Sequence, residues 1–140
     1  PLVDRLIFGL YNQKFAPTRT DLDWLSADEA NVDCYIADPL CGEKPSVNLF
    51  REMMGGLRRI LRPENLDKMD KDMPVLFIAG QDDPVGQMGE GVKKAEESFR
   101  RAGVKDVTIK LYPGLRHEIL NETDREEVYE DLYRWMEKRI

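Results

Sequence analysis

The order of apolar and polar residues in the second half of the chain predicts strand, helix, strand, helix. Residues 74–80 form a continuous apolar run, which is typical of a strand buried on both faces. Apolar residues recur at helical spacing over 89–102. Residues 106–112 alternate between apolar and polar, as in a strand with one face that is more exposed to solvent. A final helix is expected to open with a capping box from Thr123 to Glu126. The side chains expected to be buried on that helix are Val128, Leu132, Trp135 and Met136.

An earlier helix is predicted by "SVNLFREMMGGLRRIL", residues 46–61, because its apolar residues recur every three or four positions. Ser46 is a suitable N-cap, and Pro63 ends the pattern. The recurring residues are Phe50, Met53, Met54, Leu57 and Leu61. We expect them to form a buried stripe, and an exposed, adaptable surface rich in methionine is the alternative.

Two strands joined by a helical crossover predict a parallel pair in an α/β sheet. An open parallel sheet is rarely that small, so further strands are expected to be missing from this chain. Residues 1–66 have the pattern of short helices and loops, whereas residues 67–140 carry the alternation of strand and helix. The sequence therefore predicts an α/β fold with an incomplete sheet, in which a helical segment, 1–66, precedes a core segment, 67–140.

Composition argues against several classes of function. A net charge of −6 is unfavourable for nucleic-acid binding, which needs a concentrated basic surface. No stretch approaches the roughly 18 apolar residues of a membrane span, and the first residues have no signal-peptide pattern. Cys34 and Cys41 lack the CxxC spacing of a zinc or redox site, so reduced thiols and a cytoplasmic location are expected.

The only histidine of the chain, His117, follows the second predicted strand, and Asp82 and Asp83 follow the first. Parallel neighbours end at the same edge of a sheet, where open α/β sheets bind ligands. A carboxylate there accepts a hydrogen bond from one imidazole nitrogen and leaves the other as a general base. Taken singly, a loop histidine is more often a surface or capping residue, and Asp-Asp-Pro is an ordinary turn. Because the histidine and the aspartates follow adjacent parallel strands, a catalytic pair is as good an explanation as a surface histidine and an ordinary turn.

The segments "FIAGQDDPVG" and "LYPGLRHEILNE", in this order, resemble the C-terminal end of the α/β-hydrolase superfamily. The resemblance is to its monoacylglycerol lipase and lysophospholipase-like branch, also described as serine aminopeptidase-like hydrolases. "FGLYNQKF", "RTDLDWLS" and "VDCYIADPLCG" are similar to the lid of this branch. The resemblance implies a serine ester hydrolase, with these strands as the last two of its core and residues 1–66 as its helical lid. It further implies that Asp83, rather than Asp82, is the triad acid and His117 the triad base.

The nucleophile has no counterpart in this chain. The family carries its serine in G-x-S-x-G, and that motif surrounds none of the serines present, which are Ser26, Ser46 and Ser98. Because the serine precedes the acid and the base in this fold, we expect it upstream of residue 1, in a longer parent protein. The chain alone is then expected to be inactive. No metal or cofactor is expected, since "GQMGEGV" lacks the Lys-Ser/Thr ending of a phosphate loop.

Apolar lid residues are implied by the resemblance to line a groove for the acyl chain of an ester or lysophospholipid-type substrate. Packing of the lid on the core is an equally good explanation of them. The residues concerned are Phe8, Phe15, Trp24 and Leu25. Arg116 and Glu118 flank the histidine, and the sequence suggests no role for them beyond a surface ion pair.

Two rival functions stay open. One is a peptidase of the same superfamily, which shares the triad and would differ in its lid and pocket. The other is a non-catalytic protein-binding or oligomerisation module on a degraded hydrolase fold, which predicts that the side chains of Asp83 and His117 diverge. An unpaired strand edge invites pairing with another chain, so a homodimer through the sheet edge or the lid is also expected.

Overall fold

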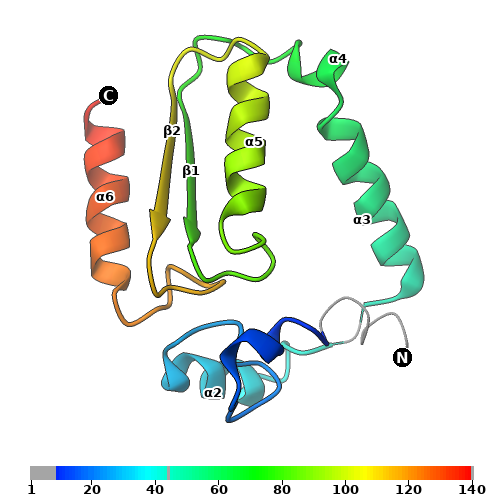
Figure 1. Ribbon diagram of the computed structural model, residues 1–140, viewed down its shortest axis with the longest axis vertical. Coiled ribbons are helices and arrows are strands. Elements are labelled where there is room, and N and C mark those ends of the chain that lie inside the picture. The colour runs from blue at the N-terminus through cyan, green and yellow to red at the C-terminus, as the bar shows by residue number, and fades with distance from the viewer. Residues whose placement is uncertain (1–8, 44, 140) are drawn as a thin grey trace.

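The computed structural model of the chain describes residues 9–43 and 45–139 (Figure 1). The first elements are a 3-10 turn and three helices: η1 (Asn12–Phe15), α2 (Glu29–Ala37), α3 (Val47–Ile60) and α4 (Pro63–Leu66). The alternating part follows as β1 (Val75–Gly80), α5 (Glu90–Arg101), β2 (Val107–Tyr112) and α6 (Arg125–Glu137). The strand and helix order predicted for the second half is confirmed.

The two strands are parallel and in register from Val75 opposite Val107 onward. The predicted parallel pair of an α/β fold is therefore confirmed. α5 forms the crossover, and α5 and α6 lie on opposite sides of the pair (Figure 1). On the α5 side the rings of Phe77 and Phe99 meet edge to face, with their centroids 5.0 Å apart.

The strands are buried differently from the prediction. Residues 75–79 are half-buried rather than buried on both faces, because β1 has β2 as its single neighbour in the described sheet. The predicted wetter face of β2 is covered by α6, so Tyr112 is buried and belongs to the core. The Tyr112 hydroxyl donates to Asp131 at 3.1 Å, and Lys110 on the same face forms an ion pair with Asp131. Burial, reinforced by the bond to Asp131, raises the pKa of Tyr112 to about 12.

The start of α6 differs from the predicted capping box. The helix begins at Arg125, and its N-cap residue Asp124 makes no side-chain capping bond, so the box from Thr123 to Glu126 is wrong. Glu122 turns its carboxylate inward at this point and accepts hydrogen bonds from the backbone N–H groups of Arg116 and of the distant Ala27. The chain therefore passes through a turn before the helix can begin.

The face that α6 buries is narrower than predicted. Val128 is completely buried, and Leu132 and Trp135 are half-buried. Met136 is exposed, contrary to the prediction. The reason is that the Trp135 indole reaches Thr108 of β2 at 3.3 Å, so the next side chain along the helix points away from the strand.

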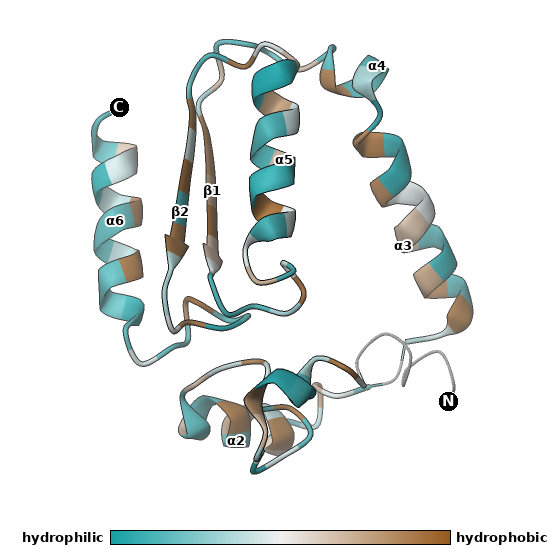
Figure 2. Ribbon diagram, viewed as in Figure 1, coloured by the Kyte–Doolittle hydropathy of each residue, from teal (hydrophilic) through white to brown (hydrophobic). Residues whose placement is uncertain are grey.

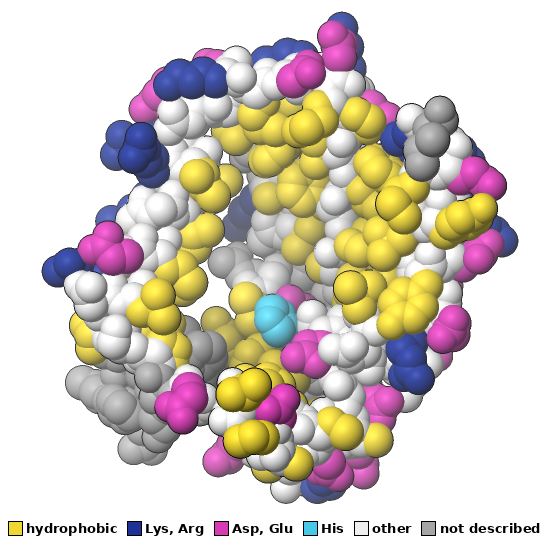
Figure 3. Space-filling view, turned by 180° about the vertical axis from the view of Figure 1, so that it is seen from behind, with side chains coloured by type: hydrophobic (Ala, Val, Ile, Leu, Met, Phe, Trp, Pro, Cys, Tyr) yellow, Lys and Arg dark blue, Asp and Glu magenta, His cyan; other side chains and the backbone are white. Residues whose placement is uncertain are grey.

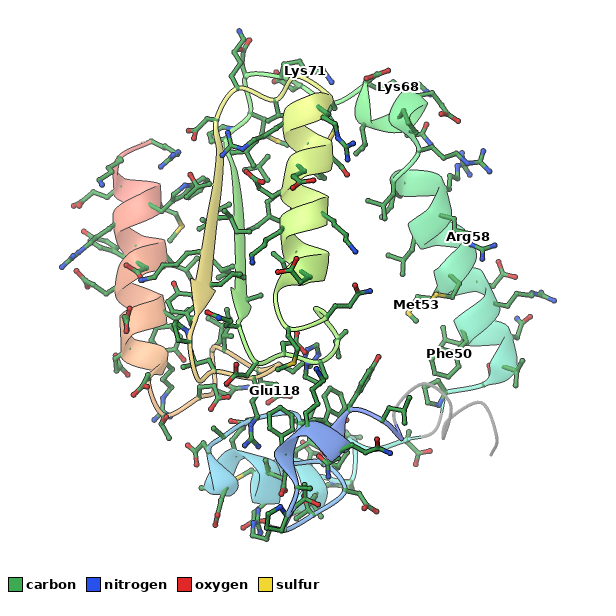
Figure 4. All side chains as sticks on the ribbon, viewed as in Figure 1. Phe50, Met53, Arg58, Lys68, Lys71 and Glu118 are labelled. Carbon is green, nitrogen blue, oxygen red and sulfur yellow. The ribbon has the colours of Figure 1, made fainter. Side chains whose placement is uncertain are left out.

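Helix α3 is confirmed, but its buried stripe is not. Ser46 caps it, because its Oγ accepts a hydrogen bond from the N–H of Leu49 at 3.1 Å. Phe50 is the one buried residue of the predicted stripe, and the others are exposed, namely Met53, Met54, Leu57 and Leu61. α3 lies apart from the strands, beyond α5, and its apolar side faces a hollow that no described residue fills (Figures 2 and 3). Phe50 and Met53 lie on the side that faces α5, whereas Arg58 points away (Figure 4).

Candidate active site

The loops that follow the two strands remain paired beyond the sheet. The N–H of Gln81 donates to the carbonyl of Tyr112 at 2.9 Å, and the N–H of Asp82 donates to the carbonyl of Leu115 at 3.0 Å. The second loop therefore crosses the end of β1 instead of turning away from it.

Glycine is required where the loops cross. A Cβ added to Gly80 would lie 2.1 Å from the carbonyl oxygen of Arg116, far inside van der Waals contact. The absence of a side chain at Gly80 lets the backbone before His117 approach the strand end that leads into Asp83.

Asp83 is fixed by its own turn. Its Oδ1 accepts a hydrogen bond from the N–H of Val85 at 2.8 Å, and its carbonyl accepts from the N–H of Met88 at 2.8 Å. The residue is buried, with 7% of its surface exposed. Pro84 restricts the backbone of this turn, so the second carboxylate oxygen keeps a constant direction.

Asp83 and His117 are in contact. Nδ1 of His117 lies 3.1 Å from Oδ2 of Asp83, so the side chains do not diverge as the non-catalytic module predicts. The hydrogen bond to Asp83 raises the pKa of His117, burial opposes the rise, and the charges of Asp83 and Glu118 add to it. With Nδ1 engaged, Nε2 is the nitrogen that remains for proton transfer. Chemically, this arrangement can act as a general base.

One aromatic ring lies next to the imidazole, and a second ring packs on the first. The centroid of Trp24 is 5.3 Å from that of His117, and the ring of Tyr11 is 5.2 Å from Trp24. Burial raises the pKa of Tyr11, and the charge of Asp83 raises it further. Trp24 is almost completely buried, and its ring, from the first part of the chain, packs against the imidazole.

Glu122 was not identified as a site residue from the sequence. Its carboxylate accepts hydrogen bonds from the N–H groups of Arg116 at 2.8 Å, Ala27 at 2.9 Å and Asp28 at 3.3 Å. In the sequence it appears as part of an ordinary helix start. Its burial depends on residues that lie 95 positions away, and no local pattern signals such a contact.

Arg116 and Glu118 do more than form a surface ion pair. The guanidinium of Arg116 donates to the carbonyls of Asp23 and Ser26, while the N–H of Glu118 donates to the carbonyl of Leu25 at 2.9 Å. Figure 4 shows Glu118 at the junction between the loop that contains His117 and the part of the chain around α2. Hydrogen bonds from the residues before and after His117 therefore hold residues 23–28 against this loop.

Three of the four predicted lid residues lie among the described residues, in different positions. Trp24 and Leu25 are buried against the loop that contains His117, and Phe15 is half-buried with the Arg116 guanidinium 4.0 Å above its ring. Phe8 lies outside the described residues.

Other features of the chain bear on the class of site. Within residues 9–43 and 45–139, no three His, Cys, Asp or Glu side chains are arranged to hold a metal ion. In the same residues, no helix combines the length and the apolar character needed to cross a bilayer. Cys34 and Cys41 are both free thiols.

Comparison with known proteins identifies a family. The profile described as "Serine aminopeptidase, S33" matches residues 2–124. Over 139 residues the chain is 30% identical to the monoglyceride lipase of Saccharomyces cerevisiae, a match that covers 89% of the chain.

Solved structures agree with this match. A thermostable carboxyl esterase from Bacillus coagulans, solved with glycerol, has a TM-score of 0.88 and 30% identity over 98% of the chain. A soluble variant of the S. cerevisiae monoglyceride lipase, solved with a substrate analogue, has a TM-score of 0.65 and 28% identity over 99% of the chain. The chain spans 42% of the lipase sequence, 45% of the esterase chain and 50% of the solved lipase chain.

Proposed function

Because the chain belongs to the serine aminopeptidase (S33) family of α/β hydrolases, we propose that it is part of a serine ester hydrolase. Asp83 is the acid and His117 the base of its catalytic triad. The observation that carries this proposal is the 3.1 Å contact between Nδ1 of His117 and Oδ2 of Asp83, at the shared edge of two parallel strands. A serine outside these 140 residues is the nucleophile.

The reaction is acyl transfer to water. Nε2 of His117 removes the proton of the attacking serine, and Asp83 stabilises the imidazolium that forms. His117 then gives this proton to the departing alcohol, which leaves an acyl-enzyme. A water molecule, deprotonated in turn by His117, hydrolyses the acyl-enzyme and restores the serine.

The serines within the chain already serve other purposes, which supports an external nucleophile. Ser26 Oγ accepts a hydrogen bond from the N–H of Asp28, and Ser46 Oγ caps α3. Ser98 Oγ donates to the carbonyl of Lys94 within α5. We therefore propose that the 140 residues alone are inactive, because they supply neither the nucleophile nor the oxyanion hole.

The substrate we propose is a monoacylglycerol or a lysophospholipid-type acyl ester. The monoglyceride lipase and the carboxyl esterase among the relatives support this class. Residues 1–66 are proposed to be the lid and residues 67–140 the end of the hydrolase core. In that arrangement Trp24, beside the imidazole, borders the position of the scissile ester, and Phe15 packs against the Arg116 guanidinium. The free thiols support the proposed cytoplasmic location.

The test is ester hydrolysis by the longer reading frame that contains this chain. We expect it to hydrolyse p-nitrophenyl butyrate and 1-monooleoylglycerol, and to be labelled by a fluorophosphonate, whereas the 140 residues alone do neither. His117→Gln and Asp83→Asn are expected to lose at least about a thousandfold in kcat. Asp82→Asn is the matched control, because the carboxylate that contacts the imidazole belongs to Asp83 and not to Asp82. Full activity in Asp83→Asn, or activity in the 140 residues alone, would refute the assignment.

A further inference from the structure

Glu122 is a buried carboxylate whose partners are all backbone groups. The residue is 0% exposed. Its two carboxylate oxygens accept hydrogen bonds from three N–H groups, those of Arg116, Ala27 and Asp28. Removing a carboxylate from water is costly, and three convergent donors offset the cost here. An apolar side chain would leave these three N–H groups without an acceptor, so the acid is explained by what it connects.

The segments that Glu122 connects meet at the imidazole. Arg116 directly precedes His117, and Ala27 lies three positions after Trp24. The Trp24 ring is the one that lies 5.3 Å from the imidazole. One carboxylate therefore holds both the backbone next to His117 and the segment against which its ring packs.

We propose that Glu122 is the positioning residue of His117. By fixing the N–H of Arg116, it holds the imidazole within hydrogen-bonding reach of Asp83. Its importance for catalysis rests on the proposed function, whereas its effect on the imidazole does not. The role requires the charge and the length of glutamate together. Glutamine would direct an NH₂ group at a backbone N–H, and aspartate is one methylene too short to reach both segments.

The single histidine makes the test direct. The imidazole Hε1 signal of the 140-residue chain is titrated by NMR in wild type, Glu122→Gln, Glu122→Asp and Asp83→Asn, with the fold monitored by circular dichroism. Because the bond to Asp83 is the largest cause of the raised pKa of His117, we expect this pKa to fall in both Glu122 variants toward its value in Asp83→Asn. If Glu122→Asp folds and its His117 has the wild-type pKa, the proposal is overturned. The negative charge at this position would then account by itself for any change seen in Glu122→Gln.

Glu126→Gln is the matched control. Glu126 is an exposed carboxylate in the first turn of α6, four positions from Glu122. Its substitution removes the same charge and none of the backbone contacts, so we expect the pKa of His117 to stay at its wild-type value. A fall as large as that in Glu122→Gln would overturn the proposal, because loss of a nearby charge would explain both.

A second measurement needs no variant and covers the case in which the Glu122 variants do not fold. In the wild-type protein, amide hydrogen exchange at Arg116 and Ala27 is expected to be slow, about tenfold or more below that of the exposed Gly114 after correction for sequence. Exchange at Arg116 as fast as at Gly114 would show that the carboxylate does not hold this loop, and would overturn the proposal. These readouts report the geometry of His117 and not turnover, so they separate a failure of this inference from a failure of the proposed activity.

Discussion

Gly80 is the residue whose substitution tests the construction of the site most directly. A Cβ at this position would lie 2.1 Å from the carbonyl oxygen of Arg116 and 2.2 Å from that of Leu115. Gly80 is not among the described glycines with a positive φ, so alanine is acceptable to the backbone and its effect is purely steric. The Gly80→Ala variant therefore separates the approach of the loops from the conformational freedom of glycine.

The size of the effect follows from these distances. Real Cβ atoms essentially never come within 3.0 Å of another heavy atom, so the loop must move by about 0.9 Å, the difference from 2.1 Å. A shift of that size along the bond would stretch the 3.1 Å contact between His117 and Asp83 to about 4 Å, outside hydrogen-bonding range. Overpacking and the loss of one backbone hydrogen bond together cost about 2–4 kcal/mol, which lowers the melting temperature by roughly 10 °C.

Two assays on the same sample check this. Thermal unfolding followed by circular dichroism gives the loss of stability, and NMR titration of His117 is expected to show its pKa falling toward the ordinary value. Gly55→Ala is the matched control. Its Cβ meets nothing within 4 Å inside α3, so it should stabilise the chain by about 0.5–1 kcal/mol and leave His117 unchanged. A Gly80→Ala protein with the melting temperature and the His117 titration of wild type would refute this account of the crossing.

The remaining predictions concern the protonation of His117 and Tyr112. The raised pKa of His117 means that its ion pair with Asp83 stabilises the fold fully below about pH 6.5 and ceases to do so as the pH rises through the folded-state pKa. Urea unfolding between about pH 5 and 9 should show this dependence in wild type, and Asp83→Asn should abolish it. The emission of Trp24 should fall as His117 gains its proton, because an imidazolium quenches a nearby indole; an unchanged pH profile in His117→Gln would contradict this. Tyr112 should ionise near its pKa of about 12. Asp131→Asn should lower that pKa in an absorbance titration, and no change would show that Asp131 does not contribute.

The elements that the sequence predicts correctly are those determined by local pattern. The apolar run at 74–80 and the alternation at 106–112 need no distant contact to specify strands, and the length of the crossover between them specifies a parallel pair. The proximity of Asp83 and His117 follows from this topology, because parallel strands end at one edge. The sequence alone therefore locates the candidate site to within a loop on each strand.

The wrong predictions of burial share a different cause, which is that burial is decided by whatever packs on an element. Tyr112 has the polar register of a solvent-facing position, yet α6 covers it. Met53 has the spacing of a core residue, yet it is exposed on the side of α3 that faces α5 (Figure 4). Periodicity shows which residues share a face, and only the complete fold shows what covers that face.

The two members of the candidate pair are held by different means. Asp83 is fixed by a turn of its own neighbours, from Pro84 to Met88, so a short stretch of sequence suffices to place it. His117 is placed by long-range contacts, above all the carboxylate of Glu122, which reaches back to Ala27. Residues 23–28 belong to the segment proposed as a lid, but their contacts make them a support for the base. A substitution in that segment is thus expected to alter the protonation of the imidazole even where it touches no substrate.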